Sequence, residues 1–348
     1  MSESILSEPL PGIFSAKIPL PRNPLKSINS YIIPDGERTL VIDLGFDLPE
    51  CKTALLAALE ELNRPWESVR VLATHSHPDH IGLLGSLAKP SYPVLGGMSG
   101  LDEIQAYDER SKVAYNVIEG RMRADLQAGI LNYEVKSLDE IESHDTSGVD
   151  ACEGFDFSDE YVVSHVNADF QKVSEGDIVT AGLYNFEVLE TPGHDQWHIC
   201  LYDKAKGVIV VGDHVLRRIT PAIGCWHPDQ DSLGQYLDSL RRLPRSGVSV
   251  VLPAHGKPVY GLNAEVDRII AHHVARLEEF YELVRDGYDN VVTISANVGW
   301  RYDNWYSWAA PQQIMSMGET LAHLFRLAHE GRIEVLNEGR YLYRFVPR

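Results

Sequence analysis

Three histidines and an aspartate crowd into one short stretch of the chain, Thr74-His75-Ser76-His77-Pro78-Asp79-His80. Imidazole and carboxylate are the usual ligands of Zn, Fe and Mn, and a buried core has no need for so many groups that prefer water. In an extended segment, His75 and His77 point to the same side. Pro78 disfavours a helical conformation at the preceding residue and helps turn the chain, which brings Asp79 and His80 to a neighbouring point. The stretch therefore predicts a site for one or two divalent metal ions.

Three more ligand-type side chains follow short apolar runs elsewhere in the chain. They are His194 after residues 186–193, Asp213 after residues 207–212 and His255 after residues 248–254. The first motif follows an apolar run in the same way, at residues 69–73. A single histidine or aspartate after a strand is usually a turn residue, but four such placements indicate a sheet with a site along one edge.

These motifs resemble those of the metallo-β-lactamase fold superfamily, and they occur in the order typical of that family. The matching motifs are His75-x-His77-x-Asp79-His80, Thr191-Pro192-Gly193-His194, Gly212-Asp213-His214 and Pro253-Ala254-His255-Gly256. The resemblance covers roughly residues 12 to 260 and includes a first hairpin that ends in Asp43-Leu44-Gly45. It implies an α/β fold, a four-layer αββα sandwich, with the site at the edge of the two sheets.

The resemblance also implies two divalent metal ions and their ligands. It assigns His75, His77 and His194 to one ion and Asp79, His80 and His255 to the other, with Asp213 between them. Zn is favoured, and Fe and Mn stay open because no cysteine ligand decides the metal. Catalytic roles are expected for Asp79, which would orient a hydroxide shared by the ions, and for the nearby imidazoles His198 and His214. His198 could act as a proton donor or orient a ligand, or lie at the surface.

Length and composition describe an ordinary globular chain with a strong acidic excess. Of its 348 residues, 44% are hydrophobic and 23% are charged. The formal net charge of −19 repels polyanions unless a local basic groove exists. We expect a cytoplasmic protein without membrane contact, because no apolar stretch reaches the length of a membrane span and no leader-like segment opens the chain. The four scattered cysteines fit a reducing compartment.

Much of the negative charge lies in an insertion at residues 101–177, which holds 19 acidic and 6 basic residues. Residues 101–131 have a helical pattern that predicts packing over the entrance of the site. Residues 139–160 are acidic with little periodicity, which indicates an exposed loop or lid, or a solvated decoration.

A second unit is predicted at residues 261–348, after a catalytic domain at residues 1–260. Its pattern indicates helices at 264–285 and 312–329, a short β-like segment at 291–294 and a hairpin at 333–345. This order resembles the winged helix of the β-lactamase-like endoribonuclease group. The unit carries 9 Arg, no Lys and 12 acidic residues, so packing or homodimer formation is favoured over binding nucleic acid.

The substrate is not decided by the motifs, because the superfamily includes thioesterases, lactonases, β-lactamases, ribonucleases, phosphodiesterases and sulfur dioxygenases. We expect a metal-dependent hydrolase that acts on a small acyl substrate, with a thioester first and a lactone or another ester next. A phosphodiesterase or ribonuclease of the same fold is the alternative. A metal-stabilised interaction protein is the non-enzymatic alternative.

Overall fold

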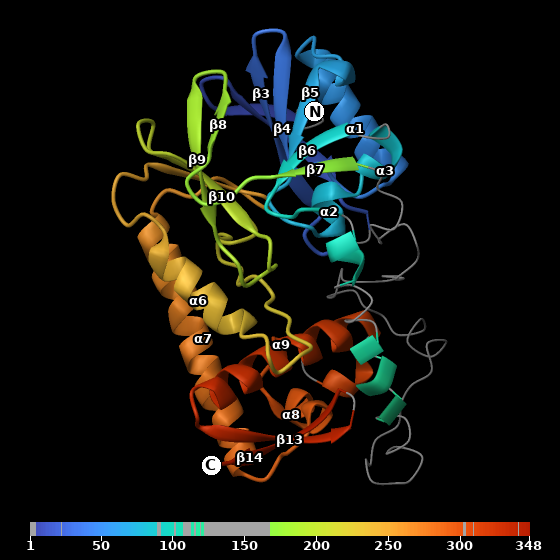
Figure 1. Ribbon diagram of the computed structural model, residues 1–348, viewed down its shortest axis with the longest axis vertical. Helices are drawn as coiled ribbons and strands as arrows, with labels where there is room; N and C mark the ends of the chain where they lie inside the picture. Colours follow the sequence, from blue (N-terminus) through green and yellow to red (C-terminus); the bar gives the residue numbers. More distant parts are fainter. Residues whose placement is uncertain are drawn as a thin grey trace.

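Two β-sheets are packed face to face in the upper half of the molecule (Figure 1). The computed structural model describes residues 5–21, 23–88, 92–100, 102–106, 113–114, 116–118, 120–121, 168–301, 304–308, 310–339 and 341–348. The first sheet has the order β1-β2-β3-β4-β5-β6-β7, and its last four strands are parallel. Its strands are β1 (Leu6–Leu10), β2 (Ile13–Pro19), β3 (Ser27–Asp35), β4 (Arg38–Ile42), β5 (Val69–Leu72), β6 (Tyr92–Gly96) and β7 (Ala168–Lys172).

The second sheet has the order β12-β11-β10-β9-β8, and only its β11–β12 pair is parallel among the described strands. Its strands are β8 (Ile178–Ala181), β9 (Tyr184–Glu190), β10 (Ile199–Asp203), β11 (Val208–Gly212) and β12 (Val250–Pro253). Every residue of β10, β11 and β12 is buried. Strands buried on both faces read as continuous apolar runs, which is why the runs that became β11 and β12 could be found from the sequence, whereas β10 was not predicted.

Helices cover the outer face of each sheet and complete four layers. Alternate residues of the first sheet point to opposite sides, so Leu40 joins the core between the sheets while Val41 packs against the outer helix. That outer helix is α1 (Pro49–Glu61), which begins with a proline in its first turn. On the second sheet the covering helix is α6 (Ser232–Arg242). Two short helices, α2 (Pro78–Ile81) and α3 (Leu84–Leu87), follow β5. The four-layer α/β sandwich predicted from the motifs is confirmed.

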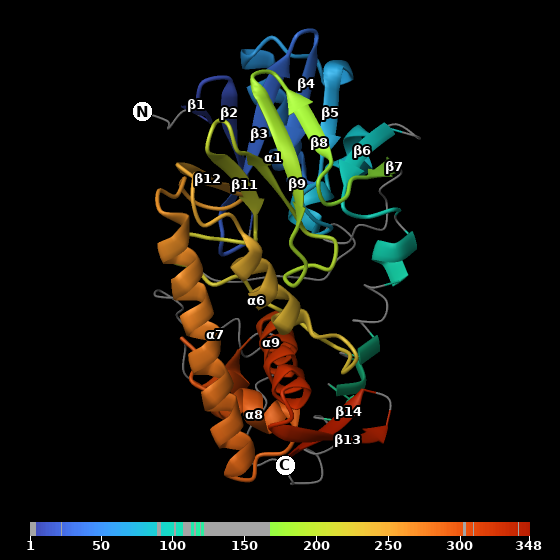
Figure 2. The same ribbon diagram turned by 60° about the vertical axis from the view of Figure 1, so that its left-hand side comes forward.

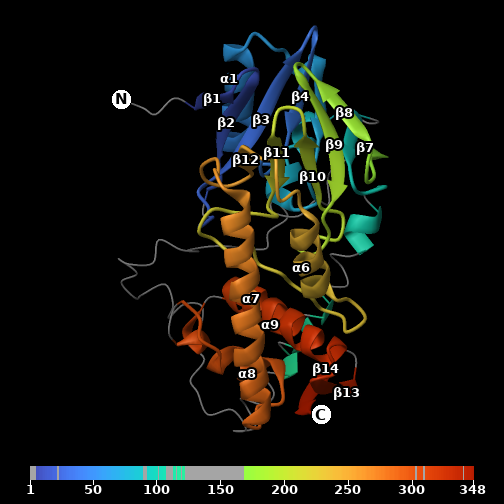
Figure 3. The ribbon, with the colours of Figure 1, turned by 90° about the vertical axis from the view of Figure 1, so that its left-hand side faces the viewer.

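The C-terminal helices and a hairpin lie below the sheets (Figures 1 and 2). They are α7 (Leu262–Arg285), α8 (Val291–Asn297), α9 (Ala310–His329), β13 (Ile333–Gly339) and β14 (Leu342–Pro347). In Figure 3, α7 runs down from beneath β12 and past α9. One apolar cluster continues from the second sheet through α6 into these elements, from Val211 through Tyr236 and Phe280 to Phe345. Helices followed by a hairpin match the predicted order, while the winged-helix identity and the boundary at residue 261 stay predictions.

Most of the predicted elements occur within a few residues of their expected positions. The expected helices at 264–285 and 312–329 are α7 and α9. The β-like segment at residues 291–294 is wrong, because these residues form α8. The Asn290 side chain accepts a hydrogen bond from the backbone N–H of Thr293 at 3.0 Å and caps the helix, which overrides the strand preference of its β-branched residues.

The acidic insertion falls mostly outside the described residues. The predicted loop at residues 139–160 is entirely outside them, and only parts of the helical pattern at residues 101–131 are described. Of those parts, Ile118 is buried in the apolar cluster that includes the C-terminal helices. Within the described part of the chain, no helix combines the length and the apolar character needed to span a bilayer.

Close packing at the end of β9 gives the first testable expectation. Gly193 has a φ of +139°, and a Cβ built on it would lie 2.4 Å from the backbone of Tyr236 in α6. We expect Gly193→Ala to lower the free energy of unfolding by about 3 kcal/mol or more, because α6 would have to move. Gly176→Ala is the matched control, since Gly176 also has a positive φ of +86° but has no heavy atom within 4 Å of its Cβ position. Urea denaturation measures the free energy of unfolding of both variants. Equal losses would show that the positive φ, and not the contact with Tyr236, is the reason for the glycine at residue 193.

Candidate metal centre

The seven predicted ligands converge at one end of the two sheets. β5 ends at Leu72, and the loop that follows carries His75 and His77 into α2, whose first turn contains Asp79 and His80. His194 follows β9, Asp213 follows β11 and His255 follows β12. These strands reach the centre with the same end, so their terminal loops lie side by side although they are far apart in sequence.

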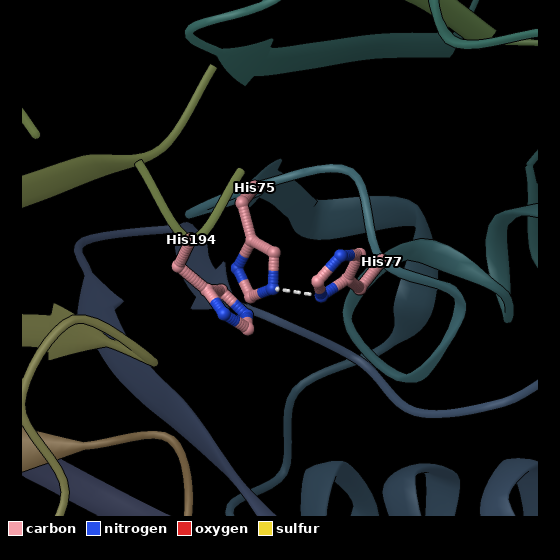
Figure 4. A group of neighbouring side chains, drawn as sticks. All are labelled: His75, His77 and His194. Atoms are coloured by element: carbon pink, nitrogen blue, oxygen red, sulfur yellow. Dashed lines mark hydrogen bonds between the residues drawn. The ribbon is translucent and has the colours of Figure 1, made fainter. Parts of the chain in front are cut away.

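The ligand atoms form three overlapping groups. Within each group the atoms lie within 4.8 Å of one another, and the groups are His75–His77–His194, His75–His80–Asp213 and Asp79–His80–His255. Figure 4 shows the first group, in which the rings of His75 and His77 approach with 3.0 Å between Nε2 and Nδ1. His75 belongs to the first and second groups and His80 to the second and third, so the three groups share residues.

The carboxylates lie between imidazoles from different strands. Asp213 Oδ2 is 3.6 Å from His194 Nε2, and Asp213 Oδ1 is 3.4 Å from His255 Nε2. Asp79 Oδ2 is 3.3 Å from His255 Nε2. The three carboxylate–imidazole contacts join loops that follow β5, β9, β11 and β12.

Buried atoms without partners show that this donor set fits divalent metal ions. Four buried donor atoms of the candidate ligands have no hydrogen-bond partner. They are His80 Nε2, His194 Nε2, Asp213 Oδ1 and His255 Nε2. A buried polar atom without a partner is costly, and a cation placed among these atoms would supply one for each. Nitrogen and carboxylate oxygen donors suit Zn, Fe and Mn. No cysteine joins any of the three groups among the described residues.

Electrostatics divide the imidazoles into two kinds. Burial lowers the pKa of His75 well below its usual value, and the neighbouring His80 and His77 lower it further. Burial and the nearby His77 lower the pKa of His194 to about 4. These rings are neutral at pH 7, which is the form that binds metal.

The other imidazoles lie against carboxylates. Burial lowers the pKa of His255, but Asp213 and Asp79 outweigh it and raise the pKa to about 10. The pKa of His80 is also raised, because Asp43 and Asp79 outweigh the effect of burial. Metal binding at these two rings therefore displaces protons.

The far nitrogens of the ligand rings are held by groups that the sequence did not reveal. His194 Nδ1 lies 2.7 Å from the carbonyl oxygen of Ala222, and His255 Nδ1 lies 2.9 Å from that of Ser27. A ring that donates Nδ1–H to a carbonyl presents the lone pair of Nε2 to the centre.

Asp43 is the most connected of these orienting residues. Its carboxylate accepts hydrogen bonds from the N–H and the hydroxyl of Thr74, both at 2.8 Å, and lies 2.8 Å from His80 Nδ1. The backbone of Asp43 is left-handed, with φ of +59°, a conformation that aspartate and asparagine tolerate better than most residues. The motif Asp43-Leu44-Gly45 was visible in the sequence, but its contact with His80 was not.

Asp195 orients the first motif from the loop after β9. Its carboxylate accepts the N–H of Ser76 at 3.1 Å and also the Ser76 hydroxyl. The sequence analysis missed Asp195, although its position directly after His194 was a usable signal.

The two predicted imidazoles outside the ligand set are buried beside it. His198 lies 2.8 Å from the Thr191 hydroxyl through Nδ1, and its Nε2 accepts the N–H of Asp213 at 3.2 Å. Because both ring nitrogens are used, this geometry favours a positioning role for His198. Burial lowers the pKa of His214 to about 3, and its ring packs against Tyr236.

Comparison with known proteins places these motifs in a family. Residues 23–255 match the family model described as the metallo-β-lactamase superfamily. The probable metallo-hydrolase YqjP of Bacillus subtilis is 24% identical, over 88% of this chain and 90% of its own length. An atrochrysone carboxyl ACP thioesterase of Emericella nidulans is 23% identical, over 74% of this chain and 60% of its own length.

Solved structures extend the similarity to nearly the whole chain. A metallo-β-lactamase family protein from Thermus thermophilus is 25% identical, with a TM-score of 0.68 over 97% of this chain and 99% of its own. A β-lactamase domain protein from Burkholderia ambifaria is 23% identical and shares the fold, with a TM-score of 0.71 over 100% of this chain and 96% of its own.

Removal of a ligand should release metal and leave the fold intact. We expect His77→Ala or Asp213→Ala to lose bound metal and to lower turnover by on the order of 100-fold or more. His227→Ala is the matched control, because its side chain is 47% exposed and lies outside the three groups. Metal analysis, initial rates and circular dichroism test this expectation, and full activity in either ligand variant would contradict the assignment.

Loss of the Asp43 charge should weaken metal binding without removing a ligand. We expect Asp43→Asn to lower metal affinity by about 10- to 100-fold, because His80 loses its carboxylate partner while asparagine keeps the left-handed backbone. The control is Asp203→Asn, since Asp203 is equally buried and accepts hydrogen bonds from the backbone N–H groups of Asn185 and Lys206. Competition with a chelator measures the metal affinity of both variants. Equal metal affinities for Asp43→Asn and Asp203→Asn would show that Asp43 does not support metal binding.

Proposed function

Since the chain belongs to the metallo-β-lactamase superfamily and is one of its hydrolases, we propose that it cleaves a small acyl substrate, with a thioester first and a lactone or another ester next. The observation that carries the proposal is the unpartnered donor set at the strand ends. Solvent reaches this donor set at Asp79, whose side chain is 13% exposed, while the rings of His80 and His255 are buried.

Two observations favour an acyl substrate over a phosphodiester. One is the likeness to an atrochrysone carboxyl ACP thioesterase, a relative whose name states thioester hydrolysis. The other is the net charge of −19, which repels a polyanionic substrate. Hydrolysis by a metal-activated water requires no serine or cysteine nucleophile.

We assign two metal ions to the centre, with Zn favoured and Fe or Mn as alternatives. His75, His77 and His194 would hold one ion, Asp79, His80 and His255 the other, and Asp213 both. Such ions lower the pKa of water and polarise a substrate carbonyl.

The protein's own groups orient the reaction. Burial raises the pKa of Asp79, but His80 and His255 outweigh it, so the carboxylate stays ionised at neutral pH. As the partly exposed carboxylate of the set, Asp79 can accept a hydrogen bond from the attacking water. His198 fixes the backbone of Asp213, and the buried ring of His214 packs beside it. These contacts support a positioning role for both imidazoles.

The remaining expectations belong to the same proposal. We assign residues 1–260 to catalysis and residues 261–348 to packing against it, in a cytoplasmic protein that acts on a small molecule. The apolar cluster that runs from β11 into α9 supports the packing role. A homodimer stays a proposal.

Paired rate measurements test the substrate class. We expect thiol release from an acyl thioester such as acyl-glutathione or acyl-CoA, and little or no turnover of bis-p-nitrophenyl phosphate, with Zn-, Mn- or Fe-loaded protein. The thioester rate should disappear with a chelator and in His77→Ala. Phosphodiester turnover without thioester turnover would replace the proposal with the phosphodiesterase or ribonuclease alternative.

A further inference from the structure

The loop after β11, residues 213–225, meets the metal centre at two points. It begins with the candidate ligand Asp213, and the carbonyl oxygen of Ala222 lies 2.7 Å from Nδ1 of His194. That second contact orients the ring so that its Nε2 faces the centre. A displacement of the residues between Asp213 and Ala222 would therefore disturb two candidate ligands at once.

The middle of this loop has little of its own to hold it in place. Among the described residues, no backbone group of residues 215–224 forms a hydrogen bond with another backbone group. Buried apolar side chains anchor the two ends of that stretch, with Val215 and Leu216 at one end and Ile223 at the other. Residues 217–219 are exposed. Their backbone must be held by side chains from elsewhere if the loop is to keep one shape.

Arg268 of α7 holds this stretch from the side of the C-terminal helices. Its Nη2 donates to the carbonyl oxygen of Ile219 at 2.9 Å and to that of Leu216 at 3.3 Å. Its Nη1 donates to the hydroxyl of Thr220 at 3.5 Å. Hydrogen bonds from a charged guanidinium group are stronger than those between neutral groups. A single side chain therefore holds residues 216–220 at three oxygen atoms.

Glu265, one turn earlier on α7, fixes the guanidinium group of Arg268. Its Oε2 accepts a hydrogen bond from Nε of Arg268 at 2.7 Å. The same oxygen accepts the backbone N–H of Arg218 at 3.5 Å. The Glu265 side chain is only 17% exposed, so this ion pair is partly shielded from solvent. The pair thus contacts the loop with both donors and an acceptor.

The far end of the loop is held by α9 instead. The N–H of Cys225 donates to the carbonyl oxygen of Gly318 at 3.1 Å. A Cβ on Gly318 would lie 3.2 Å from the ring of Trp226, so α9 packs closely against the chain at this point. Ala222 therefore lies between two attachments to the C-terminal helices, Arg268 before it and Gly318 after it.

We propose that Arg268 is a positioning residue for the metal centre. By holding residues 216–220, it keeps the carbonyl of Ala222 against His194 and fixes the chain that leaves Asp213. It acts through the loop and touches neither a metal ion nor a substrate. The C-terminal helices then support the ligands themselves, in addition to packing against the catalytic domain. This role goes beyond the proposed function, because it holds for any reaction of the centre.

Metal affinity of the full chain tests this proposal, with Arg332→Met as the matched control. Arg332 also ties α7 to another segment, through two hydrogen bonds of 2.8 Å to Glu278, but it does not contact the loop. Glu278 lies about 15 Å along α7 from Arg268. We expect Arg268→Met to lower the affinity for Zn²⁺ about tenfold and Arg332→Met to leave it within about twofold, as measured by competition with a chelator. The visible absorption of the Co²⁺-loaded protein reports ligand geometry and should change in Arg268→Met alone.

A conservative variant separates positioning from a general loss of stability. Arg268→Lys keeps the positive charge beside Glu265 but lacks the planar fork of the guanidinium group, so it should lower the Zn²⁺ affinity about threefold. This variant decides the question if Arg268→Met does not fold. Urea denaturation of the metal-free proteins measures the effect of each substitution on the fold alone.

Two results would overturn the role of Arg268. One is an unchanged Zn²⁺ affinity and Co²⁺ spectrum in the Arg268 variants. The other is an equal loss of Zn²⁺ affinity in Arg332→Met, because the loss would then follow from weaker packing of α7. Either result would leave the proposed hydrolysis of an acyl substrate in place.

Discussion

The structure around the strand ends depends on one constraint, a buried set of imidazoles and carboxylates in which several atoms have no hydrogen-bond partner. His80, His194 and His255 each keep one ring nitrogen that is buried and unpartnered, and Asp213 keeps one such oxygen. Each of these atoms would be costly if it faced only protein. The sheets must therefore hold the loops after β5, β9, β11 and β12 at a spacing that a cation can bridge. The same spacing is what would allow the centre to bind a divalent metal ion.

Close packing behind the ligands maintains that spacing. Asp43 adopts a left-handed backbone and joins the end of β4 to Thr74 and His80. Gly212 has a φ of +47°, and a Cβ there would lie 2.7 Å from the Thr74 hydroxyl and 2.8 Å from His198 Nε2. Gly212 is required because a Cβ there would collide with Thr74 and His198. Asp43 adopts a left-handed backbone while its carboxylate contacts Thr74 and His80.

The C-terminal helices are part of this arrangement through α6. The hydroxyl of Tyr236 donates to the carbonyl of His214 at 2.8 Å, and its ring contacts the rings of His214 and His273. His273 in turn lies 3.1 Å from His323 of α9. Burial lowers the pKa of both of these histidines, so the pair is neutral and packs as part of the core. The contacts run without a break from the strand ends into α9, from His214 through Tyr236 and His273 to His323.

The candidate ligands and most of the helices and strands could be predicted from the sequence, because both follow from short-range patterns. The spacing from His75 to His80 and the apolar runs before His194, Asp213 and His255 are local, as are the periodicities of α7 and α9. Tertiary structure decided what distant segments bring together. It set His80 against Asp43, His194 against the carbonyl of Ala222, and Gly318 against the loop that follows Asp213. It also made residues 291–294 a helix, because the cap at Asn290 and packing against α9 outweigh the strand preference of β-branched residues.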